Sequence, residues 1–313
     1  MKGTSLVYSS HDRSNLIHDG YIVQRALRGE SNKRILFLPM SETPQNHNEL
    51  ERQEFAWGNF RWFFNYYKGL GLEYLPFYWT SGLREQDVNL LWEQIWSSEV
   101  VIFGGGHSVT GLRRYKELGA RFGGEPGKMG RILHERKARG LLTVGFSAGA
   151  DQLCEHIFRR TYDDQSDTRG FGLVRKSMIT LHHESSRNGD IFDAAVRFRD
   201  HRIFGLPNDA GLNCDWGVLP SGAVWQAYEF VVDRTWDEPT DQFHIKTRHG
   251  GLIEHFNPEG KHWAFDNGDI LVRIQSADGR YDEGWMTSGG GLLNYWTRRP
   301  SRFSSIAEIL ASH

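Results

Sequence analysis

The chain has 313 residues, 39% hydrophobic and 24% charged, a composition typical of a globular protein rather than a disordered or fibrous one. The formal net charge of −2 argues against nucleic acid or an anionic membrane surface as the main partner. No apolar run has the length of a membrane span, and Cys154 and Cys214 are too few for a disulfide framework. We therefore expect a cytoplasmic protein without a membrane segment.

The first two thirds of the chain alternates short apolar runs with longer amphipathic segments. Continuous apolar strands that alternate with helices are typical of a parallel sheet covered by helices on both faces. The fold class expected is therefore α/β. The predicted strands span 5–9, 34–40, 72–79, 99–104, 141–146, 176–182 and 202–207, and the predicted helices span 49–67, 84–98, 108–122 and 127–140.

The pattern changes after about residue 215. Short strand candidates at 224–233, 243–256, 269–275 and 289–296 are separated by Gly, Asn and Asp turns. The last segment, 301–313, has the pattern of a helix opened by a serine cap. We expect two parts, an α/β domain over 1–232 and a β-rich C-terminal extension over 233–313 packed on it.

Ser147 stands at the predicted end of a buried strand, within the pattern G-x-S-x-G formed with Gly145 and Gly149. Small neighbours allow a sharp strand-to-helix turn that exposes the hydroxyl at the sheet edge. The start of the following helix favours a developing negative charge beside it. Ser147 is therefore predicted to be a nucleophile.

Three glycines at 104–106 follow another predicted buried strand and precede a helix. The lysine-serine pair of a nucleotide loop is absent, so an oxyanion hole is favoured over a phosphate site. We expect the backbone N–H groups of Gly105, Gly106 and Ala148 to form it. This chemistry needs no metal or organic cofactor, and neither cysteine has a metal-binding spacing with histidine.

His182 and His183 directly follow the predicted strand at 176–182 and are the candidates for the base. Because neighbouring strand residues point to opposite faces, only one of them can point inward. The acid that orients the imidazole is predicted among Asp163, Asp164 and Glu184.

The glycines at 104–106, the turn at 145–150, and the Gly-Leu pair at 172–173 followed by His182 or His183 resemble the dipeptidase E and cyanophycinase family of serine peptidases. The similar order covers roughly residues 1–232. The resemblance implies a class I glutamine-amidotransferase-like fold. It also implies a small peptide substrate, with an aspartyl or isoaspartyl residue at the cleaved bond.

The resemblance also bears on single residues. Counting from the Gly-Leu pair, as in the cyanophycinases, places the base at His182. The family also has an arginine at a usual distance after its histidine, and if Arg187 is that arginine the base is His183. Arg187 is the candidate partner of a substrate carboxylate. His107 stands where the family often has Asn, and Asn208 replaces an acidic residue. Both are further candidates for substrate binding.

Two other functions stay open at this stage. An esterase of the α/β-hydrolase fold shares G-x-S-x-G and would place its acid and base downstream, for example Asp241 with His262 or His313. A catalytically degenerate family member would instead bind a ligand or partner protein through the aromatic C-terminal part. A homodimer is one assembly left open by the sequence.

Overall fold

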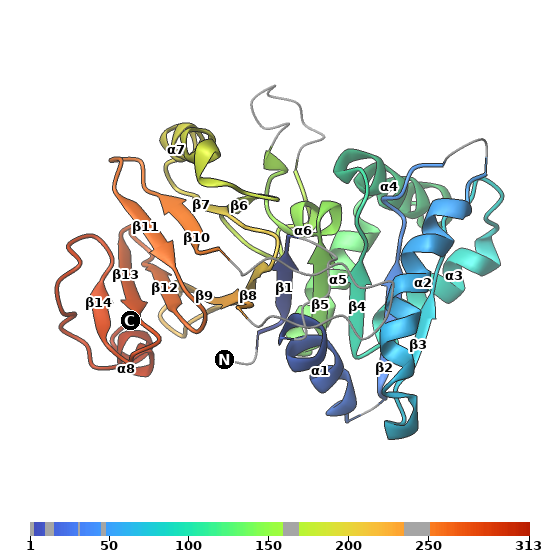
Figure 1. Cartoon of the computed structure of the whole chain (residues 1–313), viewed down its shortest axis with the longest axis horizontal. Helices are drawn as coiled ribbons and strands as arrows, with labels where there is room; N and C mark the ends of the chain where they lie inside the picture. The colour runs from blue at the N-terminus through green and yellow to red at the C-terminus, as the bar shows by residue number, and fades with distance from the viewer. Residues whose placement is uncertain (1–2, 10–15, 31, 45–47, 159–168, 235–250) are drawn as a thin grey trace.

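The computed structural model describes residues 3–9, 16–30, 32–44, 48–158, 169–234 and 251–313, and all structural statements here concern these residues. They form a ten-stranded sheet in the order β14-β13-β12-β9-β8-β1-β5-β4-β2-β3 and a four-stranded sheet in the order β11-β10-β7-β6 (Figure 1). We call the four-stranded sheet the second sheet. The expected α/β fold class, with extra β-strands at the C-terminus, is confirmed.

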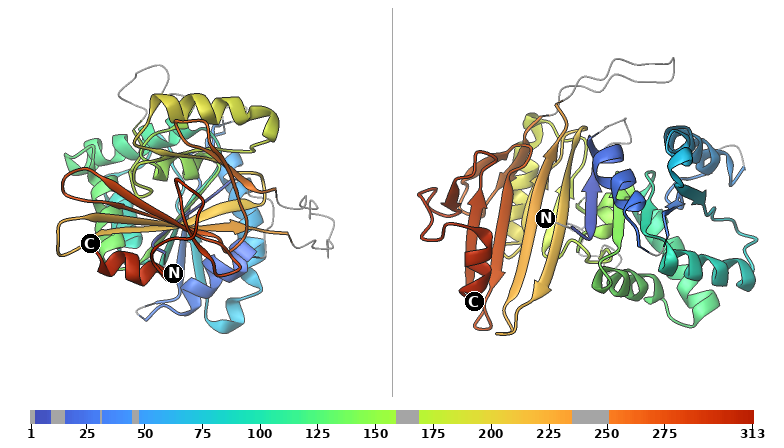
Figure 2. Two further views of the ribbon diagram at one scale, coloured as in Figure 1. Left: turned by 90° about the vertical axis from the view of Figure 1, so that its left-hand side faces the viewer. Right: turned by 90° about the horizontal axis from the view of Figure 1, so that it is seen from below.

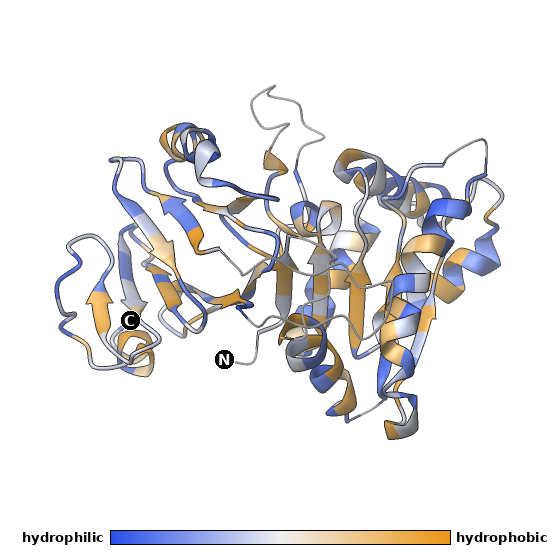
Figure 3. Cartoon of the chain, viewed as in Figure 1, coloured by the Kyte–Doolittle hydropathy of each residue, from blue (hydrophilic) through white to orange (hydrophobic). Residues whose placement is uncertain are grey.

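The parallel half of the large sheet contains the first five strands predicted from the sequence. β1 pairs with β5, β5 with β4, β4 with β2 and β2 with β3, all in parallel. In Figure 3, β4 carries the hydrophobic colour along its length, as expected for a strand buried on both faces. The strands are β1 (Ser5–Tyr8), β2 (Arg34–Leu38), β3 (Glu73–Pro76), β4 (Val100–Phe103) and β5 (Leu142–Phe146).

Side chains that alternate along these strands enter two separate cores. Ile35 and Phe37 of β2 face one core, which η1, α1 and α2 cover, whereas Leu36 and Leu38 face the other, which α3 to α6 cover. The predicted cover on both faces is therefore confirmed. The helices are η1 (Leu16–Val23), α1 (Gln24–Leu27), α2 (Glu51–Asn65), η2 (Lys68–Leu70), α3 (Glu85–Ser97), α4 (Ser108–Gly123), α5 (Lys128–Ala138) and α6 (Ala148–Leu153).

The remaining strands of the large sheet are antiparallel and continue it beyond β1 (Figure 2). β8, which the sequence did not predict as a strand, joins the two halves by pairing with β1 on one side and β9 on the other. A short C-terminal helix, opened by Ser305 as predicted, packs near the end of this half. These elements are β8 (Ala210–Val218), β9 (Val224–Val232), β12 (Ile270–Gln275), β13 (Tyr281–Met286), β14 (Leu292–Asn294) and α8 (Ile306–Ala311).

The second sheet corrects one expectation. The predicted strands at 176–182 and 202–207 form, but they leave the large sheet, pair with each other in parallel and receive β10 on the far side of β7. Ile179 and Phe204 pack in the same core as the antiparallel half, whereas Met178 and Ile203 pack in a separate cluster with α7, which lies on β7 and β10 (Figure 2). These elements are β6 (Ser177–Thr180), η5 (Ser185–Arg187), α7 (Asn188–Arg197), β7 (Arg202–Gly205), β10 (Ile253–Phe256) and β11 (His262–Phe265).

A buried group of three charged side chains joins the two sheets. Arg202 of β7 and Arg273 of β12 both contact the carboxylate of Glu283 on β13. All three side chains are almost fully removed from solvent. Strands after residue 232 thus extend both sheets, and the predicted domain boundary at that residue stays a prediction.

Two further observations concern the expectations from composition. No helix in the described ranges is long and apolar enough to cross a membrane. Cys154 and Cys214 are both buried and unpaired, as expected from their number.

Candidate active site

Ser147 lies between β5 and α6, at the carboxyl end of the parallel half. Its backbone has φ 48° and ψ −120°, a conformation that L-residues rarely adopt. The Ser147 N–H donates to the carbonyl oxygen of Tyr8 at the end of β1, which anchors the turn to the neighbouring strand. The predicted strand-to-helix turn around Ser147 is present, with the backbone strain typical of a nucleophile elbow.

The two glycines of G-x-S-x-G are required by close packing of the backbone. A Cβ atom on Gly145 would lie 2.4 Å from the carbonyl oxygen of Gly149. A Cβ atom on Gly149 would lie 2.2 Å from the carbonyl oxygen of Phe103, in β4. Because neither position has room for a side chain, glycine there allows the first turn of α6 to approach the sheet closely.

The glycine loop after β4 reaches the same turn. A Cβ atom on Gly105 would lie 3.5 Å from the Cβ of Ser147, so the loop backbone lies beside Ser147. Gly106 has φ 120°, and a Cβ there would lie 2.2 Å from the carbonyl oxygen of Ser41. Within the described residues, the N–H groups of Gly105, Gly106 and Ala148 donate to no protein acceptor.

His182 follows β6 and is the exposed member of the histidine pair. It also has a positive φ, 50°. Its backbone N–H donates to the Oγ of buried Ser9 over 2.7 Å, and its ring Nδ1 lies 2.6 Å from the Oδ1 of Asn208. Since an amide oxygen only accepts hydrogen bonds, Nδ1 carries the proton and Nε2 keeps a free lone pair.

His183 points the other way and is buried. Its ring packs on β7, where a Cβ atom on Gly205 would lie 2.5 Å from the ring. The ring Nε2 lies 2.8 Å from the Oδ1 of Asn188. Burial lowers the pKa of His183, and the contact with Asn188 opposes this only in part. The two adjacent side chains thus point to opposite sides, with His183 buried and His182 exposed, and the choice of the base between them stays a prediction.

A cavity of about 460 Å³ lies in front of Ser147. Ser147 from the large sheet and His182 from the second sheet both line it, although the described contacts include no direct hydrogen bond between them. Its described lining residues are Gly106, His107, Ser108, Val109, Ser147, Ala148, Asp151, Ile157, Phe158, Ile179, Thr180, Leu181, His182 and Arg187.

Arg187 is fixed at the wall of this cavity. Its guanidinium donates to the Oγ1 of Thr180 over 2.9 Å and to the carbonyl oxygen of Leu181 over 3.2 Å. It also contacts Asp190, one helical turn away, at 3.4 Å. Arg187 therefore brings a partly shielded positive charge to the cavity that His182 also lines.

Two predicted substrate-binding residues take positions that the sequence did not specify. His107 lines the cavity, and its Nδ1 also accepts from the Thr110 N–H as the cap of α4. Asn208 is the partner of His182 and is not among the described lining residues. Asp151, held by the Ser108 hydroxyl at 2.8 Å, lines the cavity and was missed, because a carboxylate on a short helix has no motif of its own.

The structure describes only some of the proposed acids and esterase residues. Asp163, Asp164 and Asp241 fall outside the described residues. Glu184 is exposed and is not among the described lining residues. The two alternative bases do not reach the cavity either: His262 pairs with Glu254 in the second sheet, and His313 lies 3.5 Å from Asp282.

Comparisons with known proteins concern the family and the fold. The sequence profile of peptidase family S51 matches residues 6–215. A crystal structure of a peptidase from an acI-B1 Actinobacterium superposes with a TM-score of 0.55 at 16% identity, covering 86% of this chain and 96% of that one. A putative peptidase E protein from Listeria monocytogenes EGD-e gives a TM-score of 0.43 at 18% identity, covering 66% and 92%. No curated protein matches the chain.

Proposed function

The chain belongs to peptidase family S51 and is a serine peptidase, and we propose that it cleaves small peptides beside an acidic residue, with Ser147 as nucleophile and His182 as base. One observation carries the assignment of roles. Ser147 and His182, each on a strained backbone, line the same cavity from two different sheets. Strain of this kind persists where the surrounding structure holds a residue in one functional position.

The proton arrangement of His182 supports its role as the base. Asn208 accepts the Nδ1 proton, so the Nε2 lone pair is available to take the Ser147 proton. Asn208 thus takes the orienting role that a carboxylate has in the Ser-His-Asp triad, as an asparagine does in papain-like proteases. Asp163, the acid expected from the sequence, stays a prediction.

The oxyanion of the tetrahedral intermediate needs donors that are already in place. Among the described residues, the N–H groups of Gly105, Gly106 and Ala148 have no protein acceptor. Gly105 and Ala148 adjoin Ser147, and Gly106 lines the same cavity. Ala148 is also the first residue of α6, where the partial positive charge of the helix start favours an anion.

The reaction proceeds by acyl transfer. The Ser147 Oγ attacks the peptide carbonyl carbon while His182 takes the hydroxyl proton, and the carbonyl oxygen becomes the oxyanion. His182 then gives this proton to the leaving amine as the C–N bond breaks. A water molecule, deprotonated by His182, hydrolyses the acyl-enzyme and restores Ser147.

Arg187 supports the acidic substrate. A carboxylate carried into the cavity would lose hydration, and a guanidinium can replace that hydration with two parallel hydrogen bonds. Asp151 on another part of the wall gives the cavity a negative group as well, which suits a substrate with an ammonium group. A cytoplasmic location and a homodimer remain proposals.

The test of the nucleophile is Ser147→Ala. Purified wild type is expected to react with a fluorophosphonate probe at Ser147 and to hydrolyse a dipeptide panel. The variant should fold normally, lose labelling and lose activity by at least about 1,000-fold. Unchanged turnover in the variant, with contaminating peptidase excluded, would overturn the mechanism.

The test of the substrate class uses Arg187→Ala, with Arg199→Ala as a control, because Arg199 is an exposed arginine that pairs with Glu259 away from the cavity. Wild type and the control should prefer aspartyl dipeptides over their asparaginyl analogues. Arg187→Ala should lose this preference, mainly in kcat/KM. Equal preference in all three proteins would remove the acidic substrate and leave the serine mechanism intact.

A further inference from the structure

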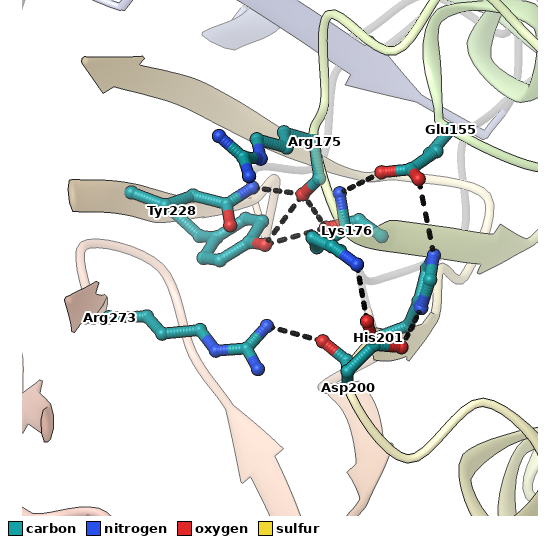
Figure 4. A network of polar contacts seen from close by, with 9 residues as sticks. Glu155, Arg175, Lys176, Asp200, His201, Tyr228 and Arg273 are labelled. Carbon is teal, nitrogen blue, oxygen red and sulfur yellow. Dashed lines mark hydrogen bonds and ion pairs between the residues drawn. The ribbon is translucent and has the colours of Figure 1, made fainter. Parts of the chain in front are cut away.

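Glu155, His156 and His201 form a cluster outside the cavity. Glu155 and His156 follow α6, the helix that begins beside Ser147, whereas His201 directly precedes β7 in the second sheet. Each residue offers one ligand atom, and these atoms lie within 4.8 Å of one another. Figure 4 shows the side chains of Glu155 and His201 pointing toward each other. None of the three is a described lining residue of the cavity.

The ring of His201 has the orientation of a metal ligand. Its side chain is only 6% exposed, and its Nδ1 lies 2.6 Å from the Oδ1 of Asp200 (Figure 4). Its Nε2 is buried, has no hydrogen-bond partner among the described residues and lies 3.9 Å from the Oε1 of Glu155. Metal-binding histidines commonly donate their second ring N–H to a carboxylate in this way.

His156 completes the same site. Its Nδ1 is also buried, without a hydrogen-bond partner in the part of the chain that the structure describes, and its ring centroid lies 5.2 Å from that of His201. Buried polar atoms without a hydrogen-bond partner are rare in proteins, so these two buried nitrogen atoms need an explanation.

The charges around the cluster are balanced. The Lys176 Nζ contacts Asp200, and the Lys176 backbone N–H donates to the Oε2 of Glu155 over 2.8 Å. Arg169 lies opposite His156 in a β-bridge and adds a positive charge near the cluster. Affinity for a cation therefore has to come from coordination by imidazole and carboxylate rather than from excess negative charge.

We propose that Glu155, His156 and His201 bind a divalent transition-metal ion of the zinc type, with Asp200 holding the His201 ring from outside. Two histidines and one carboxylate are a donor set that zinc accepts, and the ligand atoms of a tetrahedral site lie roughly 3.3 Å apart. The Nε2 of His201 and the Oε1 of Glu155 would approach by a few tenths of an ångström. The ion would tie the end of α6 to the start of β7.

The experiment measures binding and is independent of peptidase activity. Chelator-treated wild-type protein is titrated with Co²⁺, followed by visible absorption, and zinc content is measured after equilibrium dialysis. We expect one ion per chain and a rise in Tm on addition of Zn²⁺. His201→Gln should weaken binding by at least about tenfold and abolish the rise in Tm, and Asp200→Asn should weaken binding by about 10- to 100-fold.

His262→Gln is the matched control, because His262 is an exposed histidine beside a glutamate, Glu254, in the same second sheet. It should bind Co²⁺ as wild type does. If His201→Gln does not fold, His156→Gln at the half-buried position replaces it, with the same expected loss. Absence of Co²⁺ binding by wild type, or binding unchanged in both cluster variants, would overturn the proposal.

Discussion

The parallel half of the large sheet and the second sheet supply the cavity in different ways. The parallel half places Ser147 and the glycine loop through continuous local segments, each a strand followed directly by its helix. The second sheet places His182 through contacts between distant parts of the chain, with Ser9 and Asn208 holding it. β1 connects the two, because Tyr8 bonds to Ser147 and the next residue, Ser9, bonds to His182. The proposed nucleophile is thus held mainly by local structure, with one anchor on β1, and the proposed base by contacts between distant segments.

The largest effect that distinguishes the two regions is expected at the histidine pair. His182→Ala should lower kcat by about 100- to 10,000-fold with little change in stability, because the exposed ring acts in proton transfer. His183→Ala should leave kcat of the folded protein nearly unchanged but lower the free energy of unfolding, since the ring packs on β7. Steady-state kinetics and denaturant unfolding of both variants measure this. The assignment is reversed if His183→Ala is the inactive variant.

A smaller effect, on stability, is expected in the parallel half. Gly149→Ala would bring a Cβ within 2.2 Å of the Phe103 carbonyl oxygen, so α6 would have to move away from β4. We expect a loss of about 2–3 kcal/mol in the free energy of unfolding, as for other overpacked sites. The control is Gly189→Ala in α7, where an added Cβ meets no atom within 4 Å. Equal stability of both variants in urea would contradict the close packing of the turn.

The partners of the two histidines offer a finer comparison. Asn208→Ala removes the acceptor of His182 Nδ1 and should lower kcat by about 10- to 100-fold with KM nearly unchanged, because the ring loses its fixed tautomer. Asn188→Ala removes the equivalent partner of His183 and should affect stability instead. Asn208→Asp should retain most of the activity. A fall in kcat of the same size in both alanine variants would mean that neither asparagine acts through the base.

The difference between the regions also explains how far the sequence could predict the structure. The strands of the parallel half and the turn at Ser147 follow from apolar runs and glycine spacing, and all were predicted. The sequence did not predict that β6 and β7 leave the large sheet and form a second one, because their apolar pattern would suit either sheet. The contact between His182 and Asn208 spans 26 residues and depends on that topology. β8 was missed because its GLNCDWGV run interrupts the apolar pattern with polar residues and glycine.

The smallest expected effect is a pH dependence of stability in the second sheet. Because burial lowers the pKa of His183, the folded protein binds fewer protons than the unfolded chain between the folded-state pKa and about 6.5. The stabilisation is therefore complete above about pH 6.5 and is lost as the pH falls through the folded-state pKa. His183→Gln, which keeps a group able to reach Asn188, should show a smaller fall in the free energy of unfolding when the pH is lowered from 7.5, about one unit above the ordinary histidine pKa, to 5. His262→Gln, at an exposed position, should leave the fall unchanged. Urea unfolding at both pH values compares the three proteins. An identical fall in wild type and His183→Gln would show that His183 is not the buried neutral imidazole described above, and the division of roles within the histidine pair would then rest on kinetics alone.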